Sequence, residues 1–266
     1  MNRINQKFQQ LRQQKQKAFL AFLTAGVPSL RITEELVLAF EKAGVDIIEL
    51  GVPFSDPMAD GPVIQASSQK ALQQGVSLRK ILKSVKTIRG HSQIPIALMT
   101  YYNPVFRFGE KEFVRQARRA GVDGLIIPDL PPEEAGELLR EARRHDLAVI
   151  FFLSPTTTQT RLKDIVRVSR GFIYYVSLTG VTGIRRVLPQ DFVRNIRLAK
   201  RFTQKPICVG FGISTPEQAR RLAQVADGVI VGSAIVREIN RNWREKELVK
   251  NAVRFVRRLE RAVKLA

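Results

Sequence analysis

Short apolar runs alternate with longer amphipathic stretches along almost the whole 266-residue chain. Eight apolar runs predict buried strands, over residues 19–24, 46–50, 96–100, 124–128, 148–153, 172–177, 207–210 and 228–232. Helical spacing follows each run, over residues 31–43, 64–74 with 78–88, 110–120, 133–144, 159–169, 190–202, 216–224 and 234–239. Helix-start residues at Thr158 and at Ser214-Thr215-Pro216 agree with this division.

The alternating order predicts a parallel sheet covered by helices, an α/β fold. Eight such units in 266 residues predict a single domain over residues 1–266, a (β/α)8 TIM barrel. A doubly wound open sheet is the alternative. An extra N-terminal helix is expected within residues 1–17, with Ile4, Phe8 and Leu11 on one face. A C-terminal helix within residues 245–266 is expected to pack on the barrel exterior.

The chain is strongly basic, with a net charge of +20 at pH 7. This charge fits either a nucleic-acid-binding surface or a solvated surface with some attraction for anionic substrates. The basic residues are scattered over most predicted helices and form no stripe interleaved with aromatic residues. This distribution favours the solvated surface and predicts no specific nucleic-acid partner. The single Cys208 lies in an apolar run, which predicts a buried core residue and excludes an internal disulfide.

The most informative chemistry follows the second apolar run, where Glu49 and Asp60 stand at opposite ends of a turn-rich loop. Three prolines and two glycines between residues 49 and 62 stiffen this loop. A carboxylate at the end of an apolar strand is costly to bury, and no Lys or Arg lies between Lys42 and Lys70 to pair with it. Two carboxylates that face one cavity would suit proton transfer. The alternative is structural: an ion pair for Glu49 and a turn role for Asp60.

Residues for other kinds of catalysis are missing from the predicted strand ends, where barrel active sites lie. No Lys stands there for a Schiff base. His91 and His145 fall at helix ends on the opposite face, so no metal site is expected. Neither a Rossmann glycine turn nor a Walker A motif is present. Acid–base chemistry by carboxylates, without a cofactor, remains.

Glycines follow the last two predicted strands, at Gly210-Phe211-Gly212 and at Gly232-Ser233. Barrels often bind phosphate there, through backbone N–H groups and the N-terminus of a short helix. Ser233 would add a hydroxyl donor and cap that helix. Ordinary turn glycines are the alternative, but two neighbouring glycine positions favour a phosphate site at Gly212, Gly232 and Ser233.

The loop from Glu49 to Pro62 resembles the characteristic loop of the tryptophan synthase alpha chain family. Further motifs at matching positions are PDLPPEE at 128–134, LTGVTG at 178–183, GFGIS at 210–214 and GSAIV at 232–236. The resemblance extends from about Ala18 to about Val236. The ordered set is far more specific than any one of its motifs.

This resemblance implies a retro-aldol cleavage of indole-3-glycerol phosphate to indole and glyceraldehyde 3-phosphate. It implies that Glu49 moves protons to indole C3 and from the glyceryl hydroxyl, and that Asp60 accepts a hydrogen bond from the indole N–H. It extends the phosphate site to Gly183 and makes residues 178–187 a lid. The substrate-binding residues that it implies are Phe22, Ile64, Met99, Tyr174, Thr182 and Phe211.

The resemblance also implies a partner, a PLP-dependent beta chain that receives indole through a tunnel in an alpha2-beta2 tetramer. Asp56, Tyr102 and Asn103 would lie at that interface, and no PLP or other cofactor is expected in this chain. Ile184 and the following Arg185-Arg186 depart from the usual family pattern. This departure bears on how fast the lid would move and not on the chemistry that the resemblance implies.

Two other functions are compatible with parts of the sequence. A stand-alone indole-3-glycerol-phosphate lyase would share the chemistry, and a basic nucleic-acid-binding barrel with decayed catalysis would not retain both Glu49 and Asp60. No apolar stretch is long enough to cross a membrane, and residues 1–17 lack the apolar block of a secretory signal. The expected compartment is the cytoplasm, with the plastid stroma as the alternative.

Overall fold

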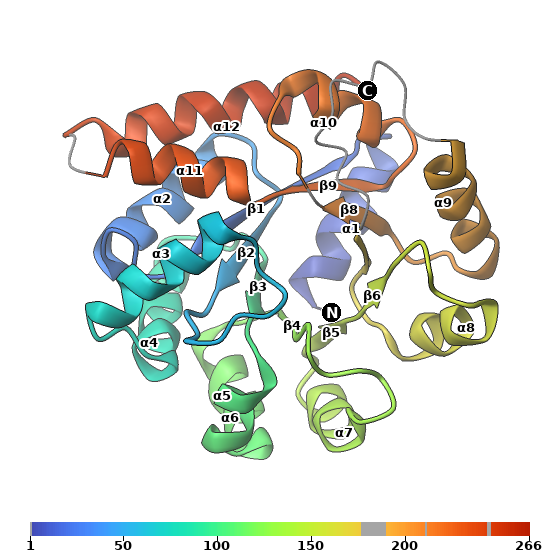
Figure 1. The fold of residues 1–266 in the computed structure, drawn as a ribbon, viewed down its shortest axis with the longest axis horizontal. Helices are drawn as coiled ribbons and strands as arrows, with labels where there is room; N and C mark the ends of the chain where they lie inside the picture. The colour runs from blue at the N-terminus through green and yellow to red at the C-terminus, as the bar shows by residue number, and fades with distance from the viewer. Residues whose placement is uncertain (1, 177–189, 211, 244–245) are drawn as a thin grey trace.

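The strands of this chain form one parallel sheet that curls into a ring surrounded by helices (Figure 1). The computed structural model describes residues 2–176, 190–210, 212–243 and 246–266. Its strands are β1 (Ala18–Thr24), β2 (Ile47–Gly51), β3 (Ile96–Met99), β4 (Gly124–Ile126), β5 (Ala148–Ile150), β6 (Phe152–Leu153), β7 (Ile173–Val176), β8 (Ile207–Gly210) and β9 (Gly228–Val231).

The helices of the described residues follow these strands in the predicted alternation. They are α1 (Arg3–Gln13), α2 (Leu30–Lys42), α3 (Pro62–Gln73), α4 (Leu78–Arg89), α5 (Tyr102–Phe108), α6 (Glu110–Ala120), α7 (Gly136–Arg144), α8 (Gln159–Val168), α9 (Gln190–Phe202), α10 (Pro216–Ala223), α11 (Ser233–Arg241) and α12 (Leu248–Lys264). The predicted starts at Thr158 and Thr215 are confirmed, because both side chains cap the following helix.

The sheet closes on itself at the fifth predicted strand. Its strand order is β5-β4-β3-β2-β1-β9-β8-β7-β6, and the two ends of that order are separated in sequence by Phe151 alone. The N–H of Tyr174 donates to the carbonyl of Phe151 at 3.1 Å, which bridges the gap. Residues 148–153 are therefore one staggered strand that pairs first with β4 and then with β7. The predicted TIM barrel is confirmed, and the open-sheet alternative is wrong.

Alternate strand residues point into the ring and form an apolar core distinct from the layer under the helices. This inner core consists of Ile4, Phe8, Leu11, Ala18, Leu20, Ile47, Ala97, Ile126, Ala148, Ile150, Phe172, Cys208 and Ile230. Cys208 is fully buried within it, as predicted. Because the outward-facing strand residues are buried under the helices as well, the strands are apolar throughout, which is why they could be located from the sequence.

The N-terminal helix α1 closes the ring at the amino ends of the strands, as its place behind the centre of the ring in Figure 1 shows. Its three buried residues join the inner core, and the rings of Phe8 and Phe172 lie 5.8 Å apart. Asn2 caps the helix and also donates to the carbonyls of Asp123 at 2.6 Å and Asp146 at 2.9 Å. Fully buried Asp123 forms ion pairs with Arg3 at 2.9 Å and with Arg89 at 2.8 Å. The predicted extra helix is thus confirmed.

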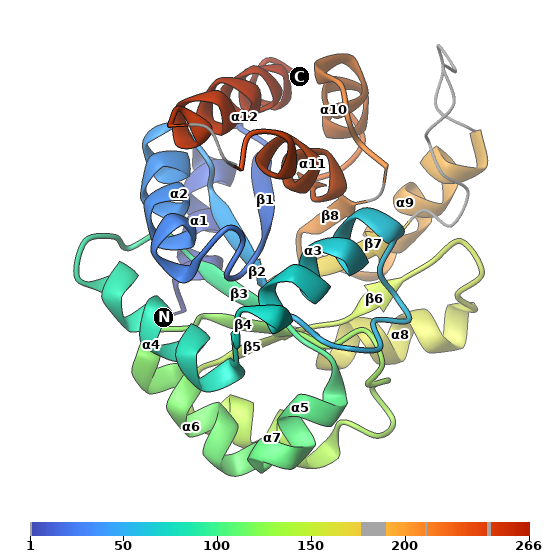
Figure 2. The same cartoon turned by 60° about the vertical axis from the view of Figure 1, so that its left-hand side comes forward.

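The C-terminal helix α12 packs on the barrel exterior against α2, α10 and α11, as predicted (Figure 2). Its buried face consists of Leu248, Ala252, Val256, Leu259 and Val263. None of the helices in the described part of the chain is long and apolar enough to cross a membrane.

Candidate active site

Glu49 lies inside the carboxyl end of the barrel because the two-residue period of β2 turns it inward with Ile47 and Gly51. In the strand register it is the neighbour of Phe22 of β1 and Ala97 of β3. The residue is 1% exposed, and neither carboxylate oxygen has a hydrogen-bond partner among the described residues. Burial, reinforced by the charge of Asp60, raises the pKa of Glu49 to about 8. This carboxyl therefore holds its proton at neutral pH and can exchange it there.

Asp60 lies on the loop between β2 and α3, where Tyr101 holds it. The Tyr101 hydroxyl donates to Asp60 Oδ2 at 3.2 Å and accepts from the N–H of Ala59 at 2.9 Å. The Tyr101 ring also stacks on Phe54, with centroids 5.0 Å apart. Burial raises the pKa of Asp60 to about 6, while the hydrogen bond from Tyr101 opposes the shift. Asp60 is therefore largely ionised at pH 7, where Glu49 is largely protonated, so the two carboxyls are suited to different roles.

The sequence argument assigned no role to Tyr101. The contact joins residues 41 positions apart, and only the closed barrel brings the end of β3 over the β2 loop. A tyrosine at the carboxyl end of a predicted strand was the available signal, because reacting groups gather there in barrels.

Phe22, Met99 and Tyr174 line the inside of the barrel next to Glu49. Phe22 is 4% exposed, and its ring lies against Gly51, where a Cβ atom would be only 2.5 Å from it. Met99 is paired with Gly51, and Tyr174 lies between Phe152 and Cys208. Burial first, and then the charge of Glu49, raise the pKa of Tyr174 well above its usual value. These aromatic and apolar side chains would form the walls of a pocket for a flat ring.

Of the remaining predicted substrate residues, Ile64 alone lies among the described residues. Ile64 is half-buried in the first turn of α3, four residues after Asp60. Thr182 and Phe211 lie outside the described residues, as does the phosphate residue Gly183. Gly210 has a structural role, because a Cβ atom there would lie 2.5 Å from the Tyr174 hydroxyl.

The predicted phosphate residues Gly212, Gly232 and Ser233 follow the last two strands of the barrel. Gly212 has a φ of +68°, which favours glycine. Gly232 is the N-cap of α11 and provides no side-chain cap, and its Cα faces Phe22. Ser233 is the first helical residue, so the expectation that Ser233 caps this helix is wrong. The N–H groups of the first turn of α11 are consequently left without a side-chain cap, which suits them to an anion.

Replacing Tyr101 with phenylalanine should lower the indole release that the family resemblance implies about tenfold near pH 6, because Asp60 loses a hydrogen bond that favours its ionised form. The pKa of Asp60 should rise further, so the acidic limb of the kcat/KM profile should move to higher pH. The loss relative to the unmodified chain should therefore shrink substantially toward pH 8. A uniform loss at every pH would instead indicate that Tyr101 only supports the loop.

One buried and one half-buried carboxyl, both of raised pKa and set among aromatic walls at the carboxyl end of a (β/α)8 barrel, define an acid–base enzyme. The family model of the tryptophan synthase alpha chain matches residues 8–264. The tryptophan synthase alpha chain of Geotalea daltonii is 53% identical over 238 residues, which cover 90% of each chain. That of Geotalea uraniireducens is 50% identical over 264 residues, 99% of this chain and 98% of the other.

A crystal structure of tryptophan synthase subunit alpha from Legionella pneumophila has the same fold, with a TM-score of 0.94 at 36% identity over 100% of both chains. The chain belongs to the tryptophan synthase alpha chain family. Members of this family are lyases of tryptophan biosynthesis that cleave indole-3-glycerol phosphate and act with a beta subunit.

Proposed function

We propose that Glu49 is the proton-transfer residue and Asp60 the stabilising anion in the retro-aldol cleavage of indole-3-glycerol phosphate by this chain. The observation that supports this best is the state of Glu49: a carboxyl 1% exposed, without a hydrogen-bond partner among the described residues, with a pKa of about 8. Such a group is costly to keep for structure alone, because nothing described here compensates its buried polar atoms.

The proposed reaction uses one carboxyl twice. Protonated Glu49 donates its proton to indole C3, which places positive charge on the ring nitrogen, and ionised Asp60 accepts a hydrogen bond from that N–H. The resulting Glu49 carboxylate then takes the proton of the glyceryl hydroxyl. The bond between C3 and the glyceryl carbon breaks, its electrons return to the ring, and an aldehyde forms. The proton taken from the glyceryl hydroxyl returns Glu49 to its starting, protonated form before indole leaves.

The phosphate of the substrate would be held at the opposite side of the pocket by backbone N–H groups around Gly212 and Gly232, with Ser233 and Gly183 as further contacts. The uncapped N-terminus of α11 supports this assignment, because the helix dipole and free N–H groups attract an anion. Thr182, on the proposed lid, would contact Asp60 after closure.

Replacing Gly232 with alanine should weaken the affinity for glycerol 3-phosphate about tenfold, because a methyl group would crowd charge-assisted N–H contacts. The backbone tolerates this change better than a change at Gly212, since Gly232 has a φ of −113° and its new Cβ would lie 3.5 Å from Phe22. Calorimetric titration measures the affinity, and circular dichroism checks the fold. A folded variant with unchanged affinity would place the anion elsewhere.

The carboxyl end of the barrel also supports the proposed beta-chain interface. Asp56 and Asn103 are exposed there, and Tyr102 is half-buried at the start of α5. Two large apolar side chains nearby are exposed as well, Met58 at 94% and Phe106 at 66%. Exposed apolar residues at the rim of an active site suit a protein partner. We propose an alpha2-beta2 tetramer in which only the beta chain carries PLP.

The decisive experiment measures indole released from indole-3-glycerol phosphate by the purified chain, with and without a tryptophan synthase beta chain. A large increase on addition of the beta chain supports the subunit role. High activity that the beta chain does not change supports the stand-alone lyase, and no indole under either condition would contradict the proposal. The cytoplasm remains the proposed compartment, with the plastid stroma as the alternative, and cell fractionation tests it.

A further inference from the structure

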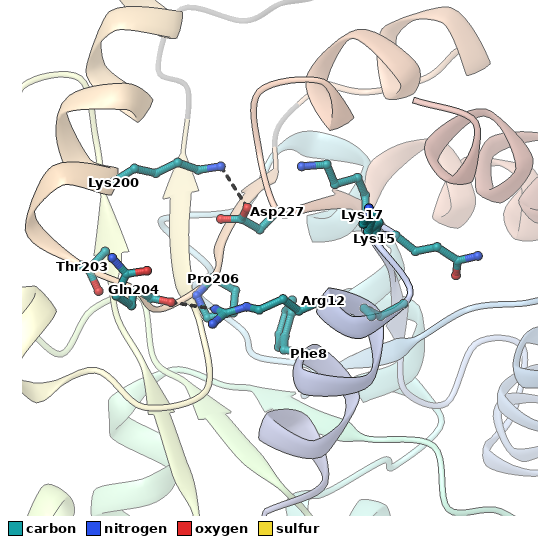
Figure 3. Close-up of a pocket in the computed structure, with 11 residues that line it drawn as sticks. Phe8, Arg12, Lys15, Lys17, Lys200, Thr203, Gln204, Pro206 and Asp227 are labelled. Carbon is teal, nitrogen blue, oxygen red and sulfur yellow. Dashed lines mark hydrogen bonds and ion pairs between the residues drawn. The ribbon is translucent and has the colours of Figure 1, made fainter.

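Four basic side chains gather in a pocket at the amino-terminal end of the barrel, opposite the candidate active site (Figure 3). The pocket has a volume of about 510 Å³ and lies between the end of α1 and the segments that precede β1, β8 and β9. Its basic residues are Arg12, Lys15, Lys17 and Lys200, and its one acidic residue is Asp227. A net charge of +3 therefore lines a single concave space, which concentrates the positive potential there.

The one carboxylate of this pocket already has its partners. Asp227 Oδ1 accepts from the ammonium of Lys200 at 2.9 Å, and Oδ2 accepts from the N–H of Ile207 at 3.0 Å. Figure 3 shows Lys17 and Lys200 extending toward Asp227 from opposite sides. Among the described residues, Lys200 alone forms an ion pair with this carboxylate, and Lys17 lies across the pocket from it.

The other three cations lack a carboxylate partner within hydrogen-bonding distance in the described part of the chain. Arg12 donates to the carbonyl of Gln204 at 3.0 Å, and no ion pair is formed by Arg12, Lys15 or Lys17 among the described residues. Burial lowers the pKa of Lys17, Asp227 opposes this shift, and the charge of Lys200 adds to it. A bound anion would relieve this repulsion between like charges.

The backbone that carries these cations is held in place before any ligand binds. The N–H of Lys15 donates to the carbonyl of Arg12 at 3.1 Å, and the N–H of Gln16 donates to the carbonyl of Leu11 at 2.9 Å. The ammonium of Lys264 donates to the carbonyl of Lys17 at 3.1 Å. A ligand would therefore order side chains only, and binding would avoid the additional entropic cost of ordering the backbone.

We propose that this pocket binds a small molecule that carries a diphosphate or triphosphate group. Ammonium and guanidinium groups form strong charge-assisted hydrogen bonds with phosphate oxygens, and a charge of +3 matches a multiply charged anion better than a single phosphate. The volume lies in the range of small-molecule sites. An adjoining pocket of about 520 Å³ shares Thr203, Gln204 and Pro206 and adds Arg170 and Lys205, which provides room for the rest of such a molecule.

Titration calorimetry with inorganic pyrophosphate at fixed ionic strength tests the proposal. The test variant carries Lys15→Gln and Lys17→Gln. The control carries Lys83→Gln and Lys86→Gln on α4, which removes the same charge from exposed positions outside the pocket. The unmodified chain and the control should bind pyrophosphate saturably, and the test variant should bind at least about tenfold more weakly. Indole release should be the same in all three proteins, and thermal melts confirm that each is folded.

Three results would overturn the proposal. Equal weakening in both double variants would mean that the overall charge, and not the pocket, attracts the anion. Inorganic phosphate binding as tightly as pyrophosphate would exclude a preference for the diphosphate group. Tighter binding of a duplex DNA that depends on Lys15 and Lys17 would assign these residues to nucleic acid instead.

Discussion

Replacing Glu49 with glutamine should lower the rate of indole release by roughly 10²–10⁴-fold. The amide has nearly the same size and shape as the protonated carboxyl, but it can neither give a proton to indole C3 nor accept one from the glyceryl hydroxyl. The affinity for glycerol 3-phosphate should change little, because the proposed phosphate contacts come from other strands. Steady-state indole release together with a phosphate-ligand titration separates the two effects.

The Glu49→Gln variant should also differ from the unmodified chain in the pH dependence of its stability, and this difference controls for misfolding. The pKa of Glu49 is about 8 in the folded chain against 4.5 for an ordinary Glu, so the folded state keeps a proton that the unfolded state loses. The stabilising effect of this proton is fully present below about pH 4.5 and is lost as the pH rises toward about 8. Because glutamine does not titrate, the variant should be increasingly more stable than the unmodified chain from pH 6 to pH 8.5. A variant that is inactive and less stable throughout would not support a catalytic role.

Replacing Asp60 with asparagine should lower kcat by roughly 10²–10³-fold, as expected when a charge-stabilising group is removed from a transition state. The neutral amide cannot offset the positive charge that develops on the ring nitrogen. It can still accept a hydrogen bond from Tyr101, so the loop after β2 should keep its position. The measurement is the complete steady-state kinetics of indole release, since kcat and KM must be separated.

A binding role and a catalytic role for Asp60 give different kinetics. An increase in KM with unchanged kcat would reduce Asp60 to a binding residue. The Tyr101→Phe variant is the matched comparison, because it alters the environment of Asp60 and leaves its charge in place. Its loss should be much smaller than that of Asp60→Asn, and it should depend on pH.

The sequence predicted the barrel well because its strands are buried on both faces and its helices on one. It did not predict the break at Phe151, since an apolar run carries no sign of where one strand exchanges neighbours. It also missed α5, a seven-residue helix that contains Pro104 in its first turn. The carboxylate of Asp129 stabilises that helix by accepting from the N–H of Tyr102 at 2.9 and 3.1 Å, a contact 27 residues apart that no local pattern reveals.

The candidate site was predictable where its residues lie on strands and less so where they lie on loops. Glu49 was identified from its place at the end of an apolar strand and from the resemblance, and Tyr174 from the resemblance alone. The role of Tyr101 depends on the path of the loop that carries Asp60 and Ala59. The basic pocket at the opposite end joins residues from 8 to 227 in sequence, so only the closed barrel assembles it.

Helix α1, which closes the ring at the amino ends of the strands, can reach its final position only after much of the barrel has been synthesised. Asn2 and Arg3 are synthesised before their partners Asp123 and Asp146, which follow 120 to 144 residues later. Contacts so distant in sequence form slowly and late in folding. Until they form, Ile4, Phe8 and Leu11 have no core to enter, so the nascent chain carries the apolar face of an amphipathic helix unburied. The segment that seals the barrel is therefore the one that depends longest on protection from aggregation.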